Sequence, residues 1–510
     1  MKKIELMELK KILFKVFTTV LALVLAVSAV LPVFGHAEDG INRDVPEIFV
    51  HGFMASTVLS DRDDPDSPSV IPSTEDILGA VKKAVPALSE FMLTRNYEKL
   101  GKAIVPLAAD IIGSLVLDPS GEPIGNSGLY YDYPSADEID RSTKIKFRYD
   151  WRLDPIQTAG ELNEFIDYIL DASGADQVVL HGHSFGGVVM TTYFRLYGYS
   201  KVRSVCYDTT AVFGETYTGE LLTGEIVLDA DAIREFMLYV FDYSEYQYLL
   251  DSIMDILRDA GLLGFISRLG NKLVDGLSPY VMPEIVAPIF AGWPSIWAMT
   301  PDEKIEPAMD YVFNDIYKDS PIDRSGLIAK IERYNSTIRP YKQEVLQTAA
   351  EKMNLYVISR YGYPLVPITP SYDTLSDGVI DTARSSFGAV TAKLNETLSD
   401  EYIASRDPGY VSPDRTVDAS TCLFPDRTWL IGGFKHSDTN ASFENMIDTL
   451  LYHDGQATVD TYGEYPRFMR YDAADNSVKP DGQQSEVGLL VKLYRIIVEI
   501  FKLIKSIFTK

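Results

Sequence analysis

Short apolar runs and helical patterns alternate along most of the chain. The apolar runs predict β-strands near residues 47–50, 144–149, 177–181, 202–207, 354–359 and 428–432. Apolar positions with a helical period predict helices near 157–172, 185–197 and 441–453. Strands that alternate with helices in this way are typical of a mostly parallel sheet with helices on both faces.

Two long insertions interrupt the alternation, at about 54–143 and 211–350. The first includes an apolar helical pattern from Glu75 to Leu117, and the second is helical and dense in aromatic residues and methionine. Both leave the predicted sheet at its carboxyl edge, where open α/β sheets bind ligands. We therefore expect a large helical cap over that edge. Apolar residues of the cap can line a pocket at this edge. For any single apolar residue, packing against other residues of the insertions is the more ordinary role.

Residues 177–187 (QVVLHGHSFGG) combine a strand, a tight turn and the start of a helix. This is the context of a nucleophile elbow, where a serine is pushed out of a strand-to-helix turn that has no room for neighbouring side chains. Ser184 is thus the predicted nucleophile, flanked by Gly182 and Gly186; the alternative is a serine that only caps a helix. The elbow predicts an α/β-hydrolase fold, with the cap described above.

The scarcity of histidine narrows the search for a base, since the chain has 6. Chain order in this fold runs from serine through acid to histidine, which leaves His436 and His453. His436 follows the strand TWLIGG, so a loop can bring it over the carboxyl edge of the sheet. His453 ends a helical run, where the favourable meeting of a cation with a helix C-terminus accounts for it. We predict His436 as the base.

The acid must lie between nucleophile and base, after another strand. The run at 354–359 is followed by a turn-rich stretch that contains Asp373, Asp377 and Asp381. Asp377 is the predicted acceptor of the His436 Nδ1–H, which would fix the tautomer of the ring. The other two aspartates are the alternatives, and an aspartate beside glycine is also an ordinary turn residue.

An oxyanion hole needs two backbone N–H donors. Phe185, directly after the nucleophile, is the predicted first donor. The second is expected from Phe53 or Met54, because the strand at 47–50 ends just before them. A plain strand-end turn at this position is the alternative.

Three segments resemble motifs of the lecithin:cholesterol acyltransferase-like family of α/β-hydrolases: FRYDWRLDP at 147–155, WPSIW at 293–297 and SDGVI at 376–380. The first stands about 30 residues before the elbow, as in the family. The resemblance spans roughly residues 45–455, as islands of matching motif. It implies a serine-dependent acyl hydrolase or O-acyltransferase that acts through an acyl-enzyme on long-chain lipid esters, such as a phospholipid or glyceride.

The same resemblance implies that Trp151, Trp293 and Trp297 contribute to substrate binding. The chain departs from the family in two places. Ser376 replaces the usual glycine before the acid, and residues 207–210 (YDTT) stand where the family has a small turn with glycine and proline. Both changes affect loops and leave the reacting groups intact.

Residues 1–37 have the pattern of an export signal, with lysines before an apolar run and small residues at Gly35 and Ala37. We expect cleavage after Ala37 and a secreted or cell-surface protein; a retained signal anchor is the alternative. Residues 38–475 are then the hydrolase domain.

A polar, flexible linker is expected at 476–488, before an amphipathic helix at 489–510. The helix carries a basic stripe on an otherwise apolar surface, which suits contact with a membrane surface. Docking on its own domain or on a second copy is the alternative.

The net charge of the whole chain is −26. Because the two ends are basic, residues 38–488 carry −33. Such a body repels nucleic acid. The sequence shows no phosphate-binding loop, metal-ligand set or other cofactor motif, so we expect neither cofactor nor metal. Cys206 and Cys422 are too few for a disulfide framework, although a single bridge between them is an alternative.

Two other functions share these features. An elbow also serves esterases and peptidases that act on cell-wall or peptide substrates. A surface-attached binding protein with a decayed site is the second alternative, and the complete set of triad candidates argues against it.

Overall fold

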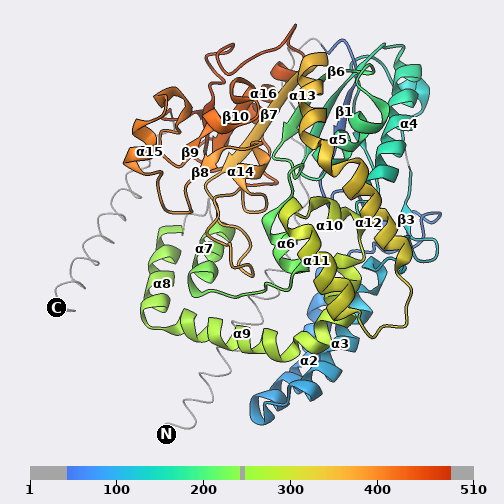
Figure 1. The fold of residues 1–510 in the computed structure, drawn as a ribbon, viewed down its shortest axis with the longest axis vertical. Helices are drawn as coiled ribbons and strands as arrows, with labels where there is room; N and C mark the ends of the chain where they lie inside the picture. Colours follow the sequence, from blue (N-terminus) through green and yellow to red (C-terminus); the bar gives the residue numbers. More distant parts are fainter. Residues whose placement is uncertain (1–42, 132, 242–246, 484–510) are drawn as a thin grey trace, which may run out of the picture.

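The computed structural model describes residues 43–131, 133–241 and 247–483. The predicted signal segment at 1–37 and the predicted helix at 489–510 lie outside the described residues. The described chain is built around an eight-stranded sheet, with long helical insertions beyond its carboxyl edge (Figure 1). No helix within these residues is long and apolar enough to cross a membrane.

The sheet is parallel except at one edge. Its strand order is β12-β11-β10-β7-β6-β5-β1-β4, and only the pairing of β11 with β12 is antiparallel. The strands are β1 Glu47–Val50, β4 Lys144–Phe147, β5 Val178–His183, β6 Val202–Asp208, β7 Asn354–Tyr361, β10 Thr428–Gly432, β11 Phe468–Asp472 and β12 Ser477–Pro480. Short pairs form between β2 Val58–Leu59 and β3 Gly128–Leu129, and between β8 Val390–Thr391 and β9 Val417–Asp418.

Side chains of the central strands alternate between two apolar cores. Leu180 and Val205 belong to a core with α4 (Pro155–Ser173), α5 (Gly186–Tyr197) and α13 (Lys342–Lys352). Their neighbours Val179 and Cys206 belong to the opposite core, with α16 (Ala441–Leu451). Because both faces are covered, the strands read as continuous apolar runs, which is why the sequence pattern located them.

The two insertions pack into one helical cap (Figure 1). Its helices are α2 Thr74–Thr94, α3 Tyr97–Ile112, α6 Thr216–Leu222, α7 Ala230–Val240, α8 Gln247–Asp259, α9 Leu262–Val281, α10 Pro294–Met299, α11 Ile305–Met309 and α12 Ser325–Thr337, with π-helices at Met282–Ala291 and Asp310–Ile316. Glycines bring α3 and α9 together, since a Cβ on Gly101 would lie 2.7 Å from the Tyr280 ring and one on Gly276 would lie 2.2 Å from the Tyr97 ring.

Shorter helices complete the connections. They are α14 Thr382–Ser385 and α15 Asp400–Ala404, and 3₁₀ turns at Gly113–Leu115, Ala136–Glu138, Asp302–Lys304, Arg339–Tyr341, Pro408–Tyr410, Ala419–Thr421 and Pro425–Arg427.

Three details differ from the sequence-based expectation. The helical pattern at 75–117 is broken at Arg95, which adopts a left-handed conformation (φ 56°) before Asn96 caps α3. The predicted linker at 476–488 is wrong in its first part, because β12 pairs with β11 there and extends the sheet to Pro480. Its part beyond 483 lies outside the described residues. The alternative of a Cys206–Cys422 bridge is wrong, since both thiols are buried and unbridged.

Candidate active site

Ser184 occupies a strained turn between β5 and α5. Its φ of 56° lies in the left-handed region, which a residue with a side chain adopts only where its surroundings enforce it. The strand carbonyls leave no space at Gly186, where a Cβ would lie 1.9 Å from the Val50 carbonyl oxygen. At Gly182 a Cβ would lie 2.0 Å from the Met190 side chain. The glycines therefore allow the close packing that forces the serine out of the strand.

His436 lies on the loop after β10, and its ring contacts Ser184. Its Nε2 is 3.0 Å from Ser184 Oγ, and its Nδ1 is 2.7 Å from Asp377 Oδ2. The His436 backbone N–H also donates to the Asp377 carbonyl at 3.0 Å. A neutral ring that donates from Nδ1 to the carboxylate has its Nε2 lone pair free to accept the serine proton.

Asp377 is fully buried and its carboxylate is saturated with donors. Oδ1 accepts the N–H groups of Val379 at 2.9 Å and Ile380 at 2.7 Å, and Oδ2 also accepts the Thr209 hydroxyl. Burial alone would raise the pKa of Asp377, but the electrostatic interaction with the His436 ring and its hydrogen bond, together with these donors, outweigh burial and lower the pKa. Asp377 is therefore ionised and fixed in place.

The alternative candidates for the acid and the base have other hydrogen-bond or ion-pair partners. Asp373 pairs with Lys393 at 2.6 Å near the surface, and Asp381 accepts the Thr216 N–H at 3.0 Å. His453 lies just after α16, with its Nδ1 2.7 Å from the Tyr462 hydroxyl. The structure thus brings Ser184, His436 and Asp377 together.

The loop at residues 51–56, hereafter the 51–56 loop, passes directly against Ser184. A Cβ on Gly52 would lie 2.7 Å from Ser184 Cβ. Met54 has a φ of 61°, a strained conformation for a residue with a side chain. Within the described residues, the backbone N–H groups of Phe53, Met54 and Phe185 have no hydrogen-bond acceptor. Phe185 also stands at the N-terminus of α5, where orphan N–H groups favour an anion.

A buried ionic cluster beside this site was missed by the sequence analysis. The Arg360 guanidinium donates to both carboxylate oxygens of Asp208, at 2.8 and 3.1 Å. It also donates to the backbone carbonyls of Lys435, His436 and Asp438, and so holds the His436 loop. Charged residues at the ends of the apolar strands β6 and β7 were the available signal, because a buried charge requires a partner.

His183, next to Ser184 in the chain, joins the same cluster. Its Nδ1 is 3.1 Å from Asp208 Oδ2, and its ring lies 4.7 Å from that of His436. Burial lowers the pKa of His183 to about 4, against the opposing influence of Asp208, so the ring is neutral at pH 7. Burial acts to raise the pKa of Asp208, but the paired Arg360 charge holds it well below its usual value.

The three tryptophans predicted to bind substrate are almost wholly buried. Trp151 and Trp293 pack edge to face at 5.3 Å, and both contact the Phe53 ring. Trp297 instead stacks on Phe313 at 5.7 Å. Two of the three thus border the 51–56 loop, and a role in substrate binding stays a prediction for all of them.

No group of three or more His, Cys, Asp or Glu side chains in the described part of the chain is arranged to hold a metal ion.

Among the comparisons with known proteins, the match to a family model supports the fold. A family model described as alpha/beta hydrolase fold matches residues 120–234, which include the elbow. A search of curated proteins finds no match to the chain. A chain of the Tle4–Tli4 complex is similar over 62% of this chain and 75% of its own, with 12% identity and a TM-score of 0.25. A meta-cleavage product hydrolase from Pseudomonas fluorescens IP01 (CumD), in complex with acetates, is similar over 65% and 77%, with 12% identity and a TM-score of 0.19.

Proposed function

We propose that this chain, which has the α/β-hydrolase fold, is a serine-dependent acyl hydrolase or O-acyltransferase that acts on long-chain lipid esters. The fold supports a hydrolase. One observation carries the reaction type, namely the continuous hydrogen-bonded path from Ser184 Oγ through both ring nitrogens of His436 to the buried carboxylate of Asp377. This is the arrangement that activates a serine for acyl transfer.

The chemistry follows from that geometry. Ser184 Oγ attacks the ester carbonyl while His436 Nε2 takes the hydroxyl proton, and Asp377 stabilises the imidazolium that forms. The N–H groups of Phe185 and of Phe53 or Met54 bind the tetrahedral oxyanion. Breakdown of this intermediate transfers the proton from His436 to the departing alcohol and leaves an acyl-Ser184 ester. Water or a second alcohol, deprotonated by the same histidine, then removes the acyl group.

The cap supports a long acyl chain as substrate. It is built from aromatic and aliphatic side chains, and it shows large apolar residues to solvent, with Leu93 of α2 87% exposed, Ile256 of α8 61% and Phe265 of α9 48%. An enzyme for small soluble esters has no need of so much apolar surface, whereas each acyl methylene buried is worth about 0.8 kcal/mol. The motifs that resemble the lecithin:cholesterol acyltransferase-like family agree with this substrate class. A secreted or cell-surface location remains part of the proposal, from residues 1–37.

The test is a panel of p-nitrophenyl esters from acetyl to palmitoyl, with phospholipid and glyceride vesicles and an added long-chain alcohol. We expect kcat/KM to rise with acyl length, by up to about fourfold per methylene. Ser184→Ala is the matched inactive control. New ester formed on the added alcohol identifies an acyltransferase, and free acid alone identifies a hydrolase.

Two outcomes would contradict the proposal. Fastest turnover of the acetyl ester, with cleavage of peptide or cell-wall substrates, would indicate the alternative class of esterase or peptidase. Absence of turnover on every ester would indicate a binding protein with a decayed site.

A further inference from the structure

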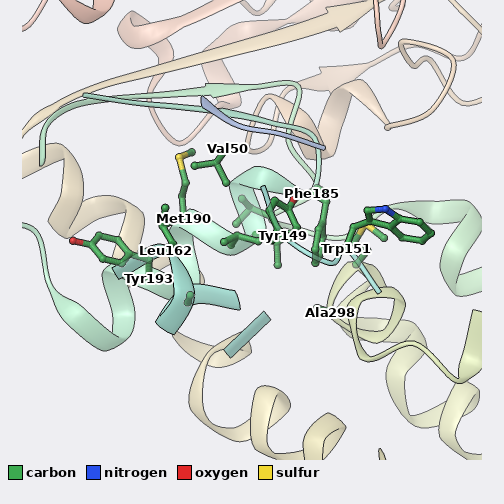
Figure 2. Close-up of a cluster of buried hydrophobic side chains, with 14 of the residues drawn as sticks. Val50, Tyr149, Trp151, Leu162, Phe185, Met190, Tyr193 and Ala298 are labelled. Atoms are coloured by element: carbon green, nitrogen blue, oxygen red, sulfur yellow. The ribbon is translucent and has the colours of Figure 1, made fainter. Parts of the chain in front are cut away.

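The segment Tyr149–Arg152 follows β4 and runs beside the 51–56 loop, although about 95 residues separate the two in sequence. Two of its side chains reach the loop from the buried side. Figure 2 shows Tyr149, Trp151 and Phe185 in one buried cluster, next to the strand that carries Val50. The motif that distinguishes this sequence therefore lies against the loop that carries the proposed oxyanion donors.

Tyr149 and Trp151 hold the two ends of the loop. The Tyr149 hydroxyl donates to the His51 carbonyl at 2.5 Å, and its ring stacks on the His51 ring at 4.2 Å with an interplanar angle of 8°. The Trp151 Nε1–H donates to the Ser56 carbonyl at 3.1 Å. Its indole also packs edge to face on Phe53 at 4.7 Å, in the middle of the loop. Both rings are fully buried, so no water competes for these contacts.

The loop is also closed on itself. His51 Nδ1–H donates to the Gly52 carbonyl at 2.6 Å, which leaves Nε2 to accept the Ser56 hydroxyl at 2.5 Å. Burial lowers the pKa of His51 well below its usual value, so the neutral ring that this pattern requires is the stable form. A hydrogen-bonded ring thus joins the first and last residues of the loop.

These contacts at the two ends of the 51–56 loop restrict the strained residue between them, Met54. Met54 keeps its left-handed conformation only if its surroundings over-determine it. The Met54 and Phe53 N–H groups lie between the two anchored carbonyls, beside the Gly52 backbone that contacts Ser184. Oxyanion donors act within a few tenths of an ångström of their correct position.

We infer that Tyr149 and Trp151 are positioning residues for the oxyanion hole, which they fix by anchoring the two ends of the 51–56 loop. The inference rests on the proposed function, since it concerns the donors of the same site. The two side chains touch the loop and have no part in proton transfer. Their loss therefore lowers kcat through misplaced donors and leaves ground-state binding unchanged. For Trp151 this role stands in place of the substrate contact that the family resemblance implies.

The experiment compares Tyr149→Phe and Trp151→Phe with two matched controls. Tyr168→Phe removes a hydroxyl that donates to the Pro134 carbonyl at 2.7 Å, and Trp429→Phe removes an indole that donates to the Tyr465 carbonyl at 2.8 Å. Each control thus deletes the same kind of bond away from the 51–56 loop. The measurements are kcat and KM on p-nitrophenyl butyrate, Ki for a trifluoromethyl ketone analogue of the intermediate, and melting temperature.

We expect kcat to fall about 10- to 100-fold in the two test variants, less than the loss for removal of a donor. The Ki of the trifluoromethyl ketone should rise in parallel, while KM stays within about twofold of wild type. Both controls should keep kcat and Ki within about twofold, whatever their melting temperature. Ser56→Ala, which removes only a hydroxyl, should also lower kcat and provides the test if Trp151→Phe folds poorly.

Tyr149→Phe and Ser56→Ala with kcat and analogue affinity equal to those of Tyr168→Phe would overturn the inference. A rise in KM at constant kcat would do the same, because it would place the residues in substrate binding. Failure of the proposed function looks different, since wild type itself would then neither turn over the ester nor bind the analogue.

Discussion

At the scale of single residues, the site is defined by which groups are buried together. Ser184, His436 and Asp377 are far apart in sequence, yet each is held by backbone bonds as well as by its neighbours. Chain order and the scarcity of histidine left His436 and His453 as candidate bases, and position after a predicted strand then favoured His436 and Asp377. The Arg360–Asp208–His183 cluster could not be predicted in this way, because its members share no motif and meet only where three strands end side by side.

Asp377→Asn should lower kcat on the order of 10⁴-fold with little change in KM. The amide can donate to His436 Nδ1 and so favours the tautomer that cannot accept the serine proton. Steady-state kinetics on a soluble ester measures the effect. Asp373→Asn, at a partly exposed carboxylate paired with Lys393, is the control and should retain wild-type activity. If kcat falls equally in Asp377→Asn and Asp373→Asn, Asp377 is not the acid of the triad.

The stability of the folded chain should depend on pH through His183. Its folded-state pKa of about 4 lies below the ordinary value near 6.5. Between these values, the unfolded chain binds a proton that the folded chain does not. Stability therefore falls as pH drops from about 6.5 to about 4, by up to about 1.4 kcal/mol per pH unit for this group.

Urea unfolding across that pH range checks this dependence. His183→Asn should show a shallower slope than wild type. If unfolding free energy depends on pH equally in His183→Asn and wild type, His183 is not the source of this dependence.

At the scale of elements, apolar runs revealed six strands, including β4 at one edge of the sheet, and missed β11 and β12 at the opposite edge. In β11 (FMRYD) and β12 (SVKP), charged or polar residues interrupt the apolar ones. These two strands form one edge of the sheet. Edge strands carry such residues because one side meets solvent. The cap helices followed from their period, whereas the break at Arg95 carries no glycine or proline to signal it.

The elbow predicts a contrast between its two glycines. Gly186→Ala places a methyl group 1.9 Å from a backbone oxygen of β1, which cannot move without shifting the strand. Gly182→Ala meets only the flexible end of Met190. We expect Gly186→Ala to lose more than about 3 kcal/mol of unfolding free energy, and Gly182→Ala about 1–3 kcal/mol.

Denaturant unfolding measures both variants. Gly113→Ala is the control, because a Cβ there meets nothing within 4 Å and the backbone is helical, with φ −56°. It should be neutral or slightly stabilising. A larger loss of unfolding free energy in Gly182→Ala than in Gly186→Ala would show that β1 does not pack against the elbow as described.

At the scale of the whole molecule, charge is distributed unevenly along the chain. Residues 489–510 carry +4, while residues 38–488 carry −33. We propose that the basic amphipathic segment contacts a lipid surface and that the acidic body stays clear of it.

Truncation after Glu486 should keep turnover on short soluble esters and lose most binding to anionic vesicles in a sedimentation assay. Replacing Lys492 and Lys502 with glutamate in the full chain should reduce vesicle binding as well, without removing the segment. A truncated protein that unfolds, or an oligomer that dissociates, with no vesicle binding by the full chain, would show instead that the segment packs on protein.

The most direct test of the central claim is covalent labelling with a fluorophosphonate, followed by mass spectrometry of the labelled peptide. The probe reacts only with a serine whose proton is removed by a base and whose oxyanion is stabilised. We expect stoichiometric labelling of Ser184 and none in Ser184→Ala. Labelling should be slowed by several orders of magnitude in His436→Ala but not in His453→Ala. Labelling at another residue, or a wild-type chain that is not labelled at all, would contradict the central claim.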